Sequence, residues 1–239
     1  MEIGGFQKLT LIDYPGKIAC TIFLIGCNFR CPFCYNPELV LPEKIKKQPR
    51  IQEKEILTFL KEKKGLLEGV CITGGEPTIH RDLPVLIRKI KKLGYSVKLD
   101  TNGSNPKMLE NLIKKKLVDY LAMDIKAPFQ IGPKRKAAKY EKATGVKINI
   151  NNIKKSVDLI KNSGIDYEFR TTIVPGLHLK GDIVQLARSI SSVKRFYLQG
   201  FQPGKNINKR YEKIRPYPQE YLLEIQRAVA FLSDVCRVR

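Results

Sequence analysis

Three cysteines lie within one short segment, at positions 27, 31 and 34. Closely spaced thiolates bind soft metals, and their usual occupants are zinc or an iron–sulfur cluster. Both normally take four protein ligands in a structural site, whereas this segment has no histidine and no fourth cysteine. Three thiolates on a cubane [4Fe–4S] cluster leave one iron open to a small molecule. The spacing therefore predicts a catalytic [4Fe–4S] centre on Cys27, Cys31 and Cys34.

The other three cysteines leave one alternative open, a structural zinc completed by a remote thiolate such as Cys71 or Cys236. Cys20 and Cys71 fall inside predicted buried strands, where a free thiol behaves as a small hydrophobic side chain. Cys236 lies in a tail that we expect to be remote from the site. We therefore place these three cysteines outside the metal centre, and in a chain with no secretion signal we expect no disulfides.

A Gly-Gly-Glu-Pro segment at 74–77 directly follows a predicted strand. Adjacent glycines let a ligand approach the backbone closely, although a plain strand-to-helix connection would also use them. The carboxylate of Glu76 would repel a phosphate and would suit a cationic amine. The segment therefore predicts a binding site for an amine rather than for an anion.

Apolar strands alternate with amphipathic helices along the chain. Six short apolar or β-branched segments are predicted as strands, at 18–25, 70–73, 96–100, 120–125, 167–174 and 195–198. Apolar residues recurring every three or four positions predict helices at 54–63, 83–93, 106–116, 153–163 and 182–191. This order favours an α/β fold with an open parallel sheet covered by helices. Six units suit a partial barrel better than a closed eightfold one.

The whole chain, 1–239, is expected to form a single domain, because no linker, repeat or low-complexity segment divides it. We place the core at about 15–204 and the C-terminal helix and tail at 216–239. The helix is predicted at 219–232, and 233–239 is predicted as a final edge strand without a chemical role.

The net charge of +21 has two interpretations, a surface for RNA or an acidic protein, and a solvated coat of lysines. The lysine runs are spread along the chain and no basic-aromatic stripe stands out, so a nucleic-acid partner is not favoured. No apolar run is long enough to span a bilayer, and the N-terminus has no leader pattern. We expect a cytoplasmic protein that does not enter membranes.

The polar residues of interest follow the predicted strands at their C-terminal ends, which meet at one edge of a parallel sheet. They are the cysteine segment, 74–77, 100–103, Asp124 with Lys126, Arg170, and Gln202. All of these residues would therefore surround the opening of a single site.

Two of these motifs together resemble the radical S-adenosylmethionine (SAM) superfamily: the cysteine segment with Phe33 before its last cysteine, and Gly74-Gly75-Glu76-Pro77 further on. The resemblance implies a partial (βα)6 barrel, a [4Fe–4S] cluster on the three cysteines, and SAM bound to the open iron through its amino and carboxylate groups. It also implies that Gly74, Gly75 and Glu76 meet the SAM amine.

The flanking residues are similar to the glycyl-radical-enzyme activases, in the branch named for anaerobic ribonucleoside-triphosphate reductase. The similar segments are 11–16, 35–38, 100–103 and 123–126, and the resemblance runs from about 5 to 204. It implies further SAM contacts from Phe33, Cys34, Tyr35, Asp124, Lys126, Arg170 and Gln202. It also implies a monovalent-cation site on Asp100, Thr101, Asp124 and the carbonyl of Ala122. Loop capping and ion pairing are an equal alternative for these carboxylates.

Two departures from the activase pattern stand out. Some activases have a histidine after the sixth strand, where this chain has only Gln202. Others insert cysteines for an auxiliary cluster after the first one, and 37–56 contains none, so we expect no auxiliary cluster. His80 and His178 are expected to hydrogen-bond locally rather than to bind metal.

The resemblance implies that the chain cleaves SAM reductively and generates a glycyl radical on a partner enzyme, with anaerobic ribonucleotide reductase as the expected partner. A one-electron donor such as flavodoxin or ferredoxin would reduce the cluster. Two alternatives remain: a radical SAM enzyme acting on RNA or a small molecule, and a non-catalytic iron–sulfur or zinc binding module.

Overall fold

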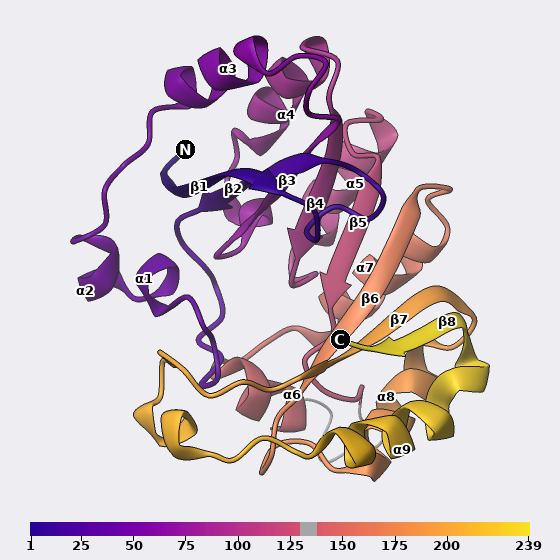
Figure 1. Cartoon of the computed structure of the whole chain (residues 1–239). Coiled ribbons are helices and arrows are strands. Elements are labelled where there is room, and N and C mark those ends of the chain that lie inside the picture. Colours follow the sequence, from indigo (N-terminus) through magenta and orange to yellow (C-terminus); the bar gives the residue numbers. More distant parts are fainter. Residues whose placement is uncertain (130–137) are drawn as a thin grey trace.

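The computed structural model describes residues 1–129 and 138–239, and in it the strands form one sheet in chain order (Figure 1). Strand β1 (Ile3–Thr10) runs antiparallel to β2, and every later neighbour pair is parallel. The remaining strands are β2 (Ala19–Leu24), β3 (Gly69–Gly74), β4 (Ser96–Thr101), β5 (Tyr120–Asp124), β6 (Asp166–Ile173), β7 (Val193–Gly200) and β8 (Ser233–Val238).

Helices lie in the connections between the parallel strands; most of the longer ones lie against the outer face of the sheet, whereas the two four-residue helices that follow β2 stand apart from it (Figure 1). They are α1 (Pro37–Val40), α2 (Pro42–Ile45), α3 (Glu53–Glu62), α4 (Leu83–Lys92), α5 (Pro106–Lys114), α6 (Ala138–Thr144), α7 (Ile150–Lys161), α8 (Lys180–Ile190) and α9 (Gln219–Val229). Short 3-10 turns occupy Pro77–Ile79, Lys209–Lys213 and Ala230–Leu232.

Local sequence explains where a helix such as α5 begins. Asn105 caps it, because its side chain accepts a hydrogen bond from the Met108 amide, and Pro106 stands at the first helical position, where no amide donor is needed. Leu109 and Leu112 are fully buried on its inner face. The apolar period therefore sets which face of the helix packs on the sheet.

The six predicted strands and the parallel α/β order are confirmed, as is the edge strand at the end of the chain. Strand β1 and the short helices α1, α2 and α6 were not predicted. The sequence of β1, IGGFQKLT, lacks an apolar alternation, and most of its residues are at least partly exposed because it pairs only at the edge of the sheet. Its position depends on pairing with β2, which local sequence does not report.

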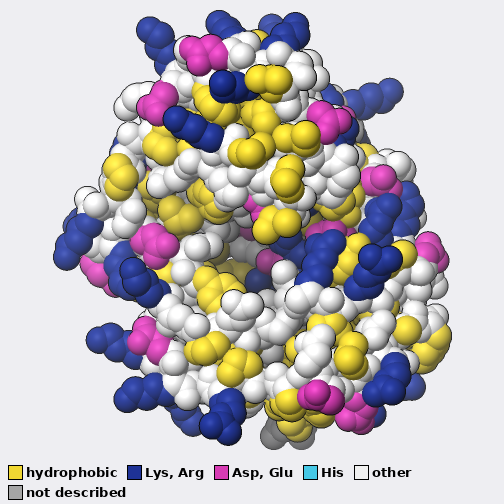
Figure 2. Space-filling model, viewed as in Figure 1, with side chains coloured by type: hydrophobic (Ala, Val, Ile, Leu, Met, Phe, Trp, Pro, Cys, Tyr) yellow, Lys and Arg dark blue, Asp and Glu magenta, His cyan; other side chains and the backbone are white. Residues whose placement is uncertain are grey.

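The sheet curves around an open centre, and the two edge strands, β1 and β8, lie on either side of that opening (Figure 1). Parallel pairing aligns the strand ends, so that Leu24 of β2 lies opposite Gly74 of β3. A space-filling view shows a hollow in the middle of this face, with charged side chains visible inside it (Figure 2). The fold thus gathers the C-terminal ends of the strands around one hollow.

Within residues 1–129 and 138–239, no helix combines the length and the apolar character needed to cross a membrane.

The contribution of the core can be tested with two phenylalanines of opposite exposure. Phe196 on β7 is 1% exposed, whereas Phe231 is 74% exposed. We expect Phe196→Ala to lower the free energy of unfolding by about 3–5 kcal/mol, through lost burial and a cavity. Phe231→Ala should change it by about 0.5 kcal/mol or less. Urea unfolding followed by circular dichroism measures both values, and equal losses would contradict this packing.

Candidate functional site

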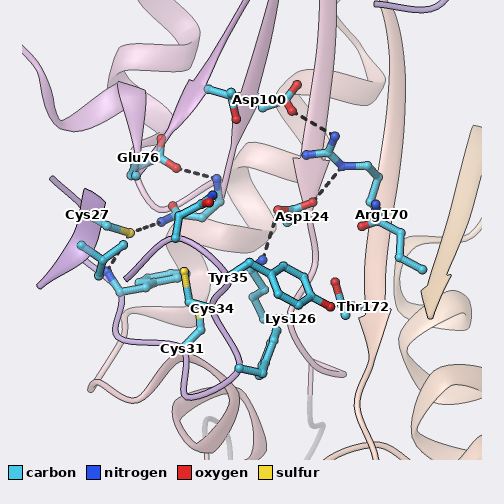
Figure 3. Close-up of a pocket in the computed structure, with 18 of the residues that line it drawn as sticks. Cys27, Cys31, Cys34, Tyr35, Glu76, Asp100, Asp124, Lys126, Arg170 and Thr172 are labelled. Atoms are coloured by element: carbon cyan, nitrogen blue, oxygen red, sulfur yellow. Dashed lines mark hydrogen bonds and ion pairs between the residues drawn. The ribbon is translucent and has the colours of Figure 1, made fainter. Parts of the chain in front are cut away.

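A cavity of about 550 Å³ opens at the C-terminal ends of the strands. Most of the residues predicted for the site line it, several of them labelled in Figure 3: Cys27, Cys31, Phe33, Cys34, Tyr35, Gly74, Gly75, Glu76, Asp100, Thr101, Asp124, Lys126, Arg170 and Gln202. Ala122, whose carbonyl was predicted for the cation site, is fully buried and is not among the lining residues. These residues come from strands and loops that are far apart in the sequence. The structure therefore brings the predicted residues together, while the role of each remains a prediction.

The cysteine segment follows β2 as an irregular loop that backbone contacts hold in place. Within the loop, the Arg30 guanidinium donates to the carbonyl oxygens of Cys27 and Phe29, at 2.6 and 2.7 Å, and the Cys34 amide donates to the Cys31 carbonyl at 3.0 Å. From outside, the Arg30 amide donates to the Thr144 carbonyl at 2.7 Å. These contacts fix the shape of the loop.

The three thiols of this loop are free and sheltered. Cys31 is 8% exposed, and burial raises the pKa of Cys31 to about 11 and that of Cys27 to about 12. Burial also raises the pKa of Cys34. At neutral pH the metal-free thiols therefore stay protonated, and a bound metal must displace their protons.

The donor set fits a multi-iron cluster. Three thiols line one cavity, and in the described part of the chain no three Cys, His, Asp or Glu side chains are grouped to hold a single metal ion. A cubane does not need such a group, because each thiolate binds a different iron. Cys20, Cys71 and Cys236 lie in β2, β3 and β8 and are not among the residues that line the cavity.

The two glycines at 74 and 75 let their segment pack against the cysteine loop. A Cβ on Gly75 would overlap the carbonyl oxygen of Gly26, and a Cβ on Gly74, which has φ +120°, would overlap the backbone of Leu24. The amides of Gly75 and Glu76 donate to the carbonyls of Leu24 and Gly26, both at 2.8 Å. The glycines are therefore needed because the two backbone segments pack closely against each other. The sequence had suggested a different reason, the close approach of a ligand to the backbone.

Glu76 is 1% exposed, and its carboxylate is already hydrogen-bonded within the protein. It accepts from the Thr101 hydroxyl at 2.8 Å, from the Asn102 amide at 2.6 Å, and from both the amide and the hydroxyl of Thr78. Burial raises the pKa of Glu76, and these hydrogen bonds oppose the rise. Beside it, the carbonyl oxygen of Gly75 accepts no hydrogen bond from any residue that the structure describes. That carbonyl is an acceptor available to a ligand.

A network of ion pairs crosses the cavity wall from β4 to β6 (Figure 3). Arg170 donates from Nη1 to Asp100 at 3.0 Å and from Nε to Asp124 at 2.9 Å. Lys126 pairs with Asp124 at 3.1 Å, and Lys98 pairs with Asp100. Burial alone would raise the pKa values of both aspartates, but the neighbouring cations, Arg170 above all, hold them below their usual range. Both carboxylates are therefore ionised at neutral pH.

This network bears on the predicted monovalent-cation site. Both of its carboxylates, Asp100 and Asp124, pair with cationic side chains of the chain itself, and the Thr101 hydroxyl donates to Glu76. Ion pairing, the alternative interpretation, is thus what the structure shows for the two aspartates. The cation site remains a prediction.

Tyr35 and Gln202 meet across the cavity mouth. The Gln202 amide donates to the Tyr35 hydroxyl at 2.7 Å, and the Tyr35 ring stacks on Phe201 with centroids 6.3 Å apart. Gln202 therefore contacts the tyrosine through its backbone, and it is one of the residues that line the cavity.

Several residues of the site were missed from the sequence. Gly145, with φ +69°, passes so close to the cysteine loop that a Cβ would overlap the carbonyl of Arg30. Its sequence context is an ordinary helix end, so only the fold reveals this contact. Arg239, in a tail given no chemical role, lines the cavity, as do Thr172 and Gln199.

His178 hydrogen-bonds locally as predicted. Its Nδ1 accepts from the Val174 amide at 3.1 Å, and its Nε2 lies 2.9 Å from the Lys126 carbonyl. For His80 the local hydrogen bond stays a prediction; its buried Nε2 has no hydrogen-bond partner among the residues that the structure describes.

Comparison with known proteins shows which family this chain resembles. Residues 21–190 match the model of the Radical SAM superfamily. A *Methanocaldococcus jannaschii* protein named for glycyl-radical enzyme activation is 36% identical over 91% of this chain and 87% of its own length. The pyruvate formate-lyase-activating enzyme of *Clostridium pasteurianum* is 28% identical over 89% of this chain and 86% of its own length.

Among solved structures, *Streptococcus suis* SuiB bound to S-adenosylmethionine superposes with a TM-score of 0.66 at 16% identity. The match covers 92% of this chain and 51% of SuiB, so this chain spans about half the length of that protein. At this identity the likeness shows the fold alone.

Loop–loop packing can be tested with two glycines. Gly75→Ala should push the 74–76 segment away from Gly26 and reduce iron and sulfide incorporation severalfold. Gly181→Ala is the control, because a Cβ there meets nothing within 4 Å. Iron and sulfide are assayed after anaerobic reconstitution, and a normal cluster content in Gly75→Ala would contradict this account of the glycine.

The metal centre itself is tested by alanine substitution of each cysteine. Cys27→Ala, Cys31→Ala and Cys34→Ala should abolish cluster assembly, whereas Cys20→Ala, Cys71→Ala and Cys236→Ala should retain about one [4Fe–4S] cluster per chain. Iron content and the visible absorption spectrum report the outcome. One tightly held zinc with no iron in the anaerobically prepared protein would instead support a structural zinc site.

Proposed function

The chain belongs to the radical SAM superfamily and, within it, to the glycyl-radical-enzyme activating enzymes, and from this premise we propose that its partner is an anaerobic ribonucleoside-triphosphate reductase. The flanking motifs support this partner. Asp13-Tyr14-Pro15-Gly16 precedes the cysteine loop and Tyr35-Asn36-Pro37-Glu38 follows it, as in the branch named for that reductase. The absence of further cysteines at 37–56 also matches the short activases.

Cys27, Cys31 and Cys34 hold the [4Fe–4S] cluster in this proposal. The observation that carries it is their joint placement, because three sheltered thiols line the same cavity as the Gly-Gly-Glu segment. The cluster and SAM together supply one-electron cleavage of the SAM sulfonium, which yields methionine and a 5′-deoxyadenosyl radical able to take a hydrogen atom from a glycine.

The chain's own groups orient SAM. The carbonyl of Gly75, beside Glu76, accepts from the SAM amine, and Glu76 shapes the segment through its hydrogen bonds to Thr78, Thr101 and Asn102. Lys126 keeps donors available after pairing with Asp124, and we assign Asp124 and Lys126 to the ribose. Arg170 donates to both carboxylates, so it fixes Asp100 and Asp124 in place. The recessed position of the cavity limits the access of water to a reactive carbon radical.

The electron donor is proposed to be a one-electron carrier of the flavodoxin or ferredoxin kind. Such carriers are acidic, and the strongly basic surface of this chain would favour their approach. The cytoplasmic location expected from the sequence remains a prediction.

The partner is tested by electron paramagnetic resonance. Reduced, cluster-loaded protein is incubated without oxygen with SAM and an anaerobic ribonucleotide reductase, and a glycyl-radical doublet on the reductase is expected. Cys31→Ala should give no signal and Cys236→Ala a normal one, since only the first lies in the cysteine loop.

The doublet should disappear when the glycine of the reductase is replaced by alanine. If the reductase acquires no radical while RNA or a small molecule stimulates SAM cleavage, the alternative of a different radical SAM substrate replaces this one.

A further inference from the structure

The side of the cavity farthest along the sheet from the cysteine loop carries a row of polar side chains. Thr172 of β6 is paired in register with Gln199 of β7. The Arg239 amide donates to the Leu198 carbonyl at 2.8 Å and the Gly200 amide donates to the Arg239 carbonyl at 3.1 Å, so Arg239 stands next to Gln199. Thr172, Gln199 and Arg239 thus form one row across three strands, and all three line the cavity.

The polar groups of this row are available to a ligand. Across residues 1–129 and 138–239, neither the Thr172 hydroxyl nor the side-chain amide of Gln199 makes a hydrogen bond within the protein, although both residues pair through their backbones in the sheet. Arg239 is held in place, because its guanidinium lies 3.4 Å from the centre of the Tyr197 ring and one N–H reaches Glu168 at 3.3 Å. A guanidinium has five N–H donors, so Arg239 keeps several of them free.

The chemistry of the row differs from that of the cofactor side. Two members are neutral and can both donate and accept, and the charge of Arg239 is offset by Glu168, which is 1% exposed. A site for phosphate would concentrate unpaired cations. A peptide main chain, in contrast, offers one N–H donor and one C=O acceptor at each residue, and this row complements both.

The dimensions also suit an extended peptide. Neighbouring strands are about 4.8 Å apart, so three strands span about 10 Å, and an extended peptide covers that length in about three residues. A glycine has no side chain, so an enzyme that acts on it can fix its position only through the main chain of that residue and its neighbours.

We propose that Thr172, Gln199 and Arg239 bind the main chain of the partner's glycine loop and present the glycine Cα to the SAM side of the cavity. This inference rests on the proposed function and adds to it how the substrate is recognised. The three side chains are positioning residues, since they touch the peptide rather than the hydrogen that is transferred.

The test uses a capped peptide, acetyl-Ala-Ala-Gly-Ala-Ala-amide, with both glycine Cα hydrogens replaced by deuterium. Cluster-loaded wild-type protein, SAM and dithionite as the electron source are mixed without oxygen. A Cα–D bond of glycine breaks, a bond from that deuterium to the 5′ carbon forms, and the unpaired electron stays on Cα. Mass spectrometry should find deuterium in 5′-deoxyadenosine although the peptide has only methyl side chains.

If the main chain is recognised, N-methylation of the glycine or of the next alanine removes one N–H donor from the peptide. The peptide concentration that gives half-maximal deuterium transfer should then rise about fivefold to tenfold. We expect a similar rise in that peptide concentration for each of three variants, Thr172→Val, Gln199→Leu and Arg239→Gln. Each variant should weaken SAM binding less than it weakens peptide binding. Arg237→Gln is the matched control, since Arg237 lies on the same strand and face but is not among the residues that line the cavity.

Three results would overturn the inference. Equal losses of SAM and peptide affinity would place the row in the SAM site, and unchanged peptide saturation on N-methylation would exclude main-chain binding. If deuterium reached 5′-deoxyadenosine from a peptide with the reductase-loop sequence but never from the alanine peptide, the enzyme would be recognising peptide side chains rather than the main chain. In each case a glycyl radical on the reductase would leave the proposed function standing, whereas its absence would remove both.

Discussion

The polar site depends on one arginine held between two carboxylates. Arg170 of β6 binds Asp100 of β4 and Asp124 of β5, so a single guanidinium connects three strands at the ends where the cavity opens. Buried charges are costly unless they are paired with good geometry, and removing one partner leaves the others exposed to that cost. Lys98 and Lys126 pair with the same two aspartates, so three cationic side chains share two carboxylates. The buried charges on this wall of the site are therefore stable only when all members of the ion-pair network are present.

Two kinds of chemistry face each other across the cavity. On the β2–β3 side, backbone contacts between the cysteine loop and the Gly-Gly-Glu segment fix three thiols and leave one carbonyl free. On the β6–β8 side, Thr172, Gln199 and Arg239 present neutral or charge-compensated hydrogen-bonding groups. The arrangement separates a side suited to metal and cofactor from a side suited to a peptide.

Much of this was predictable from the sequence, because the signals are local. The cysteine spacing, the apolar period of helices such as α5, and the position of polar residues after strands each appear within a few residues. Contacts between distant segments could not be predicted. Nothing near Gly145 indicates that it touches Arg30, and nothing near Arg239 indicates that β8 aligns it with Gln199. The function of Gly75 also depended on knowing that the Gly26 carbonyl lies against it.

The cysteine loop is held by residues that are synthesised long after it. The Phe33 carbonyl accepts from the Asn206 side chain at 3.0 Å, across 173 positions of sequence, and the Pro32 carbonyl accepts from the Asn208 amide. On the ribosome, the thiols therefore emerge early, but their loop gains its last contacts only when the segment after β7 has folded back onto it. Cofactor loading into a finished pocket is consequently a late event in the life of the nascent chain.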